Sequence, residues 1–143
     1  MRLTVFLVLF SLFAVSAQAK LPDDEKSFLL KERELSRKVE QAETTKAMNE
    51  AQVAVEQYLR DELTNCDQMA RRSFRGDLLK QYTESQEKWQ AYRNSMWRLL
   101  ESKFKGAQGS ISGIQLSSYL QTLDHNRILE ILTLLQGLQR SEK

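Results

Sequence analysis

The sequence predicts an all-α protein, a small antiparallel helical bundle of three to four helices that follows a cleaved signal peptide. Long stretches contain no helix breaker, because the chain has one proline, Pro22, and three of its five glycines lie between Gly106 and Gly113. Apolar residues recur along these stretches at helical spacing, and no segment shows the alternation typical of a strand. Helices joined by short connections pack most economically as antiparallel neighbours.

Residues 1–19 have the features of a signal peptide. Arg2 gives a positive start, residues 3–15 are almost entirely apolar, and Ala17 and Ala19 have the A-x-A spacing that signal peptidase recognises. We therefore expect cleavage after Ala19 and a periplasmic or secreted protein. The apolar run is shorter than the roughly 20 residues that span a bilayer, so we expect no stable membrane anchor after cleavage.

The remaining residues 20–143 have the length of one domain. Loss of Arg2 leaves 20 basic side chains against 19 acidic ones, a formal charge of +1, which gives no reason to expect a nucleic-acid partner. The single cysteine, Cys66, excludes an internal disulfide. It is either buried as a small apolar side chain or exposed and able to link two chains.

Residues 20–43 are expected to form a charged N-terminal helical segment. Pro22 and the acids that follow it suit a helix N-terminus. The apolar stripe formed by Phe28, Leu35 and Val39 is thin, so loose attachment is expected.

Residues 44–140 are expected to form the main helical domain. Apolar spacing predicts helices at about residues 44–63, 77–104 and 114–138, with the "TNCD" stretch of residues 64–67 loosening the end of the first. In "KGAQGSISG", Gly106 is expected to end one helix and Ser112 to cap the next. The middle helix is expected to bury one continuous face, made of Leu78, Tyr82, Trp89, Tyr92, Met96, Leu99, Leu100 and Phe104.

The stretch "QEKWQAYRNSMW" in this helix is either a structural clamp or part of a ligand site. Arg93 lies four residues after Trp89 and four before Trp97, so the three side chains share one strip. An arginine can lie flat against an indole while its edge donates hydrogen bonds. From the residues alone, we favour a buried tryptophan covered by Arg93 over a ligand site.

A longer pattern suggests a family. Q-x-x-W-x-x-Y-R is formed by Gln86, Trp89, Tyr92 and Arg93, and Gly109, Ser110, Leu123 and Arg127 follow it in order. Over about residues 44–132 this order resembles the LprI-like lysozyme inhibitor domain, an exported helical domain of bacteria. The resemblance implies a binding protein whose partner is a lysozyme or another envelope protein. Such an inhibitor would occlude the lysozyme cleft, and the candidate inhibitory loop contains Lys105, Ser110 and Ser112. The alternative is a non-inhibitory periplasmic interaction or envelope-maintenance module on the same fold.

Two positions depart from the family pattern together. The expected cysteine pair is replaced by Trp97 and Tyr119. A paired replacement suggests an aromatic contact that joins the same two helices. Arg93 is then expected to lie along this contact and to bond to a carbonyl or to an acid on the last helix, with Asp124 as the nearest candidate.

No enzyme signature accompanies this pattern. His125 is the only histidine and Cys66 the only cysteine, and their spacing fits no metal site. The chain has no glycine-rich phosphate loop. We therefore expect no catalytic residue, metal or cofactor.

Overall fold

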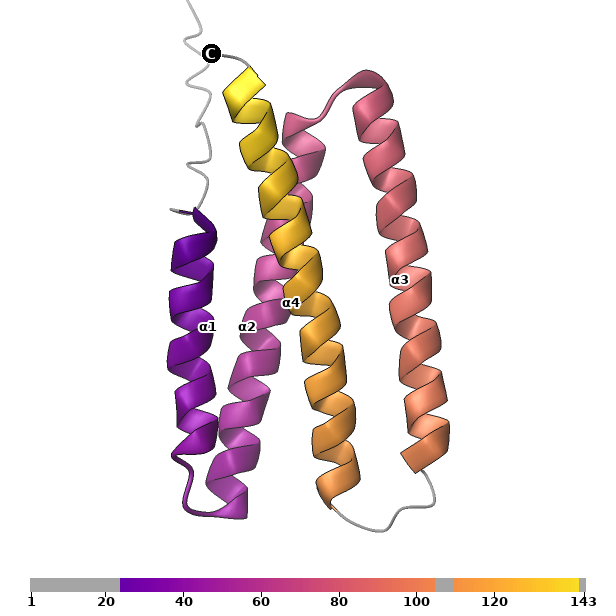
Figure 1. Cartoon of the computed structure of the whole chain (residues 1–143). Coiled ribbons are helices and arrows are strands. Elements are labelled where there is room, and N and C mark those ends of the chain that lie inside the picture. The colour runs from indigo at the N-terminus through magenta and orange to yellow at the C-terminus, as the bar shows by residue number, and fades with distance from the viewer. Residues whose placement is uncertain (1–23, 105–109, 142–143) are drawn as a thin grey trace, which may run out of the picture.

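The computed structural model describes residues 24–104 and 110–141, and this part of the chain forms four α-helices without a strand. They are α1 (Asp24–Glu40), α2 (Thr45–Ser73), α3 (Gly76–Phe104) and α4 (Ser110–Ser141). Consecutive helices run in opposite directions, and α4 crosses in front of α2 in Figure 1. The predicted all-α helical bundle is confirmed. None of these helices is long and apolar enough to cross a membrane.

The ends of α2 follow from local chemistry. Its N-cap is Thr44, whose hydroxyl oxygen accepts a hydrogen bond from the Ala47 amide at 3.1 Å. The helix does not loosen at residues 64–67, as the sequence suggested, but continues to Ser73. The Thr64 hydroxyl donates to the Arg60 carbonyl at 2.9 Å, so this polar side chain is satisfied without leaving the helix. After Phe74 and Arg75, α3 starts at Gly76, whose φ of 55° is readily adopted only by glycine.

The core is formed mainly by α1, α2 and α4. Its largest fully buried side chains include Phe74, Leu59, Ile128 and Ile131. The helix α1 belongs to this core and is not loosely attached. Phe28 is 3% exposed and stacks on Tyr58, and Glu32 pairs with His125 of α4 at 2.8 Å. The apolar stripe of α1, although thin, is therefore sufficient to attach this helix to the core, because the Glu32–His125 contact supplements it.

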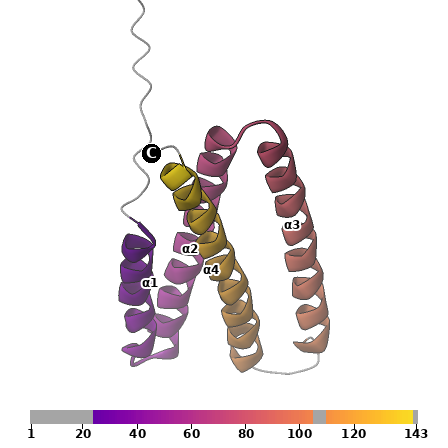
Figure 2. The ribbon, with the colours of Figure 1, turned by 45° about the horizontal axis from the view of Figure 1, so that its top comes forward.

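The helix α3 departs from the predicted packing. Only its first part approaches α2 closely, and the two helices separate with distance from their connecting turn (Figures 1 and 2). Tyr82 is buried, but Leu78, Tyr92 and Leu99 are exposed, so the expected continuous buried face is wrong. Helical spacing placed these side chains on one face correctly, but a diverging helix covers only part of that face.

Cys66 lies inside the core. Its side chain is fully buried and free, so the buried alternative is confirmed and a link to a second chain would require local opening. Burial raises the pKa of the Cys66 thiol from 9.0 to about 12. Burial also raises the pKa of Tyr58 to about 12, and burial together with a hydrogen bond to Asp67 raises that of Tyr82.

Because the pKa values of these three groups are raised, we expect the folded protein to lose stability in alkali. Above about pH 9 the unfolded chain loses protons from Cys66, and above about pH 10 from the tyrosines, whereas the folded chain retains them. The free energy of unfolding should therefore fall steadily from pH 9 to pH 12. Urea titrations across this range measure the slope, and Cys66→Ala should make it shallower. A free energy of unfolding that is constant up to pH 11 would contradict the prediction.

Candidate functional site

The residues of the Q-x-x-W-x-x-Y-R pattern meet the last helix along the α3–α4 interface. Gln86, Trp89, Tyr92 and Arg93 lie on α3, and each makes a contact with a residue of α4. Leu123, the apolar position of the pattern on α4, is half-buried. The four pattern residues on α3 therefore belong to one spatial cluster with α4.

Arg127 of α4 is among the most buried members of this cluster. It is 7% exposed, and its Nε donates to Gln86 Oε1 at 2.9 Å, while Gln86 is itself 7% exposed. Its two remaining nitrogens donate to Ser85 Oγ at 3.1 Å and to Glu130 Oε2 at 2.9 Å. Its guanidinium also lies 5.9 Å from the Trp89 ring centroid. All three nitrogens of this guanidinium are thus engaged, two of them with α3.

Arg93 makes the reciprocal contact from α3 to α4. Its Nε and Nη2 donate to the two carboxylate oxygens of Asp124 at 2.5 and 2.7 Å, a bidentate pair. Asp124 is 7% exposed. This contact raises the pKa of Arg93, chiefly through its hydrogen bond to Asp124. The predicted Arg93–Asp124 bond is confirmed.

Two other details of the predicted clamp are wrong. The arginine at Trp89 is Arg127 rather than Arg93, whose guanidinium is held by Asp124. Trp97 makes no ring contact with Tyr119. Instead, the Tyr119 hydroxyl lies 3.4 Å from that of Tyr92, and this hydrogen bond raises the pKa of Tyr119. Two aromatic side chains do join the helices through their hydroxyls, but the one on α3 is Tyr92, five residues before the expected Trp97.

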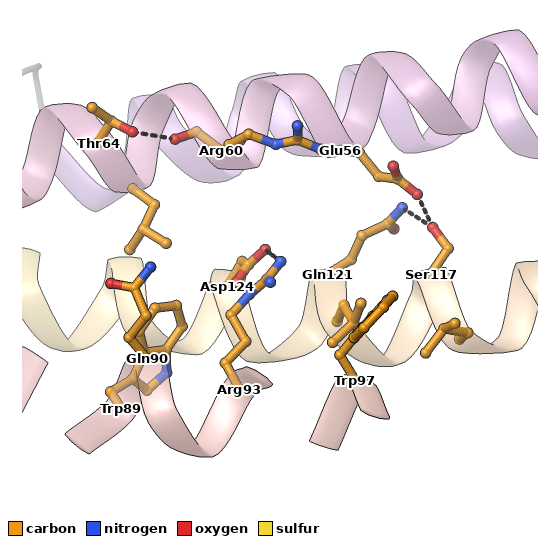
Figure 3. A pocket seen from close by; sticks show the side chains of 13 residues that line it. Glu56, Arg60, Thr64, Trp89, Gln90, Arg93, Trp97, Ser117, Gln121 and Asp124 are labelled. Carbon is orange, nitrogen blue, oxygen red and sulfur yellow. Dashed lines mark hydrogen bonds and ion pairs between the residues drawn. The ribbon is translucent and has the colours of Figure 1, made fainter. Parts of the chain in front are cut away.

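A groove of about 680 Å³ opens between α2, α3 and α4, where α3 diverges from α2 (Figure 3). Trp89 and Trp97 line it from α3, and the Arg93–Asp124 pair lies between them. Trp89 is half-buried rather than a core residue, and Trp97 is 41% exposed. The strip of α3 formed by Trp89, Arg93 and Trp97 thus contacts α4 on one side and lines the groove on another.

The α2 and α4 sides of the groove carry polar side chains beside Leu63, Leu116 and Leu120. The Ser117 hydroxyl donates to the Glu56 carboxylate, and the Gln121 amide donates to Ser117 Oγ at 3.1 Å (Figure 3). Arg60 lines the groove from α2, and its guanidinium makes no hydrogen bond or ion pair with the described residues. Sequence analysis missed Glu56, Arg60, Ser117 and Gln121, because ordinary helical surface residues carry no signal of which neighbouring helix they will face.

Comparison with models of protein families, with curated proteins and with solved structures returns no match.

The candidate inhibitory loop lies mostly outside the described residues. Lys105 and Gly109 are among the residues outside the described ranges. The helix α4 begins at Ser110, so Ser112 lies within its first turn and does not cap it, contrary to expectation.

The remaining reactive side chains have structural surroundings. Cys66 is fully buried, and His125 Nδ1 lies 2.8 Å from Glu32 while its ring contacts Phe28. Within residues 24–104 and 110–141, no three His, Cys, Asp or Glu side chains gather where they would hold a metal ion.

Proposed function

We propose that this chain is an exported, non-catalytic binding protein of the LprI-like type, with a lysozyme as its first candidate partner. The observation that carries the proposal is the contact of Gln86 and Trp89 on α3 with Arg127 on α4, all three of them residues of the family pattern. Residues that resemble a family in their spacing have a shared structural task here. Their contact supports the resemblance, because the matching residues are neighbours in the structure and not only in order along the sequence.

In this proposal, the motif holds the α3–α4 hairpin in shape and the partner binds elsewhere. A lysozyme cleft acts through two carboxylates, which a protruding donor can block. The proposed donors are Lys105, in the sequence that joins α3 to α4, and Ser110, the first residue of α4. The residues of the clamp then serve binding indirectly, because they fix the two helices from which this connection emerges.

A second candidate is a non-inhibitory interaction module of the bacterial envelope. The near-neutral charge of residues 20–143 favours it, because a basic lysozyme associates fastest with an acidic surface. The inhibitor and the interaction module differ in whether the protein binds and inhibits a lysozyme.

A lysis assay separates them. Purified residues 20–143 should slow the clearing of a bacterial cell suspension by lysozyme in proportion to their concentration. They should also form a one-to-one complex with that lysozyme by light scattering, which excludes an effect on the cell wall alone. Lys105→Ala combined with Ser110→Ala should weaken inhibition at least tenfold, whereas Lys80→Ala, an exposed change on α3, should not.

If lysozymes of several structural classes are neither inhibited nor bound by the folded protein, the inhibitor proposal is wrong. The interaction module is then the better account.

A further inference from the structure

Both tryptophans of the chain line the same groove. Trp89 and Trp97 are eight residues apart on α3, which separates them by about 12 Å along the helix. Arg127 lies over the Trp89 ring, 5.9 Å from its centroid, and Trp97 is 41% exposed. Two indoles at this separation present apolar surface to a ligand longer than a single ring.

The charges of the described residues that line the groove cancel, because two are basic and two are acidic. Arg93 is neutralised by Asp124 in a bidentate pair, and Arg60 on α2 faces the same groove as Glu56, one turn earlier on that helix. An anionic ligand would meet the Glu56 carboxylate, and a cationic ligand would meet the Arg60 guanidinium. The balance favours an uncharged ligand.

The polar groups also disfavour a purely apolar ligand. A lipid chain or an apolar helix would remove water from Glu56, Arg60 and Gln90 without replacing their hydrogen bonds, which is unfavourable for each group. Hydroxyl groups satisfy both kinds of partner, since each donates one hydrogen bond and accepts others. A sugar combines such hydroxyls with apolar ring faces.

We propose that the groove between α2, α3 and α4 binds a neutral oligosaccharide, whose ring faces stack on Trp89 and Trp97 and whose hydroxyls bond to Glu56, Arg60 and Gln90. A volume of about 680 Å³ lies within the range of ligand pockets, roughly 300–1,000 Å³. The described residues that line the groove lie on α2, α3 and α4. This binding goes beyond the proposed inhibition and does not depend on it.

The chain offers a direct measurement. Because its only two tryptophans line the groove, the tryptophan emission of the protein reports on this site alone. The probe is the soluble tetramer of β-1,4-linked N-acetylglucosamine, with the corresponding glucose tetramer for comparison. A saturable change in tryptophan emission with at least one of these neutral sugars, and matching heat in calorimetry, is the expected result.

Variants locate the binding. By calorimetry, Trp97→Ala should weaken binding about tenfold, or about 1.4 kcal/mol, as expected for the loss of one aromatic contact. Trp97→Phe should retain more affinity than Trp97→Ala, and Arg60→Ala should weaken binding independently. Leu78→Ala, an exposed change on α3 outside the groove, is the matched control and should bind normally.

Several outcomes would overturn the proposal. One is the absence of saturable binding of both neutral tetramers to protein that is helical by circular dichroism. Another is binding that Trp97→Ala and Arg60→Ala leave unchanged, and a third is preference for polygalacturonate, a polyanion. The assay contains no lysozyme, so none of these results bears on inhibition.

Discussion

Arg127→Ala is expected to lower the free energy of unfolding by about 2–4 kcal/mol, the largest effect among the variants considered. The change removes three side-chain hydrogen bonds and the contact with Trp89. It also leaves the Gln86 amide, which is 7% exposed, without its partner. An unsatisfied buried polar group is destabilising beyond the loss of the bond itself.

Thermal and urea unfolding followed by circular dichroism measure this effect, and the melting temperature should fall by roughly 10 °C. Arg127→Lys should recover only part of the loss, because an ammonium group lacks the planar fork that reaches both Gln86 and Ser85. Arg98→Ala is the matched control, since Arg98 is exposed on α3. Equal stabilities for the two alanine variants would show that Arg127 does not clamp the helices.

Arg93→Ala is expected to lower the free energy of unfolding by about 2–3 kcal/mol, because it leaves the buried Asp124 carboxylate without a partner. The defect lies in the unpaired charge rather than in lost packing alone. Removing both charges, in Arg93→Met with Asp124→Leu, should therefore restore most of the stability.

A double-mutant cycle measures this coupling. The two single changes, Arg93→Met and Asp124→Leu, should destabilise by more in sum than the double variant does, with an interaction energy of about 2 kcal/mol. Additive effects would mean that the bidentate contact contributes nothing measurable to the folded state. In either case the cycle separates the pair from the Arg127 contacts, which involve other side chains.

Much of the local structure was predictable from spacing. The four helices and the strip shared by Gln86, Trp89 and Arg93 follow from the periodicity of the chain. The bond between Arg93 and Asp124 was expected from the family resemblance, which implied that these two helices are neighbours. The extent of α2 was not predictable in this way. The stretch at residues 64–67 has a composition typical of a loop, and it stays helical because Cys66 is buried and Thr64 bonds to the preceding turn.

The sequence by itself determined which residues share a face of each helix, because those faces depend only on a fixed rise and rotation per residue. Only the tertiary structure decided which faces meet. It paired Arg127 rather than Arg93 with Trp89, Tyr92 rather than Trp97 with Tyr119, and buried Cys66 in the core. It also turned α3 away from α2 and so opened the groove. The physical reason is that the distance and crossing angle between two helices depend on how the side chains of all the helices pack together. The spacing of residues along one helix does not contain this information.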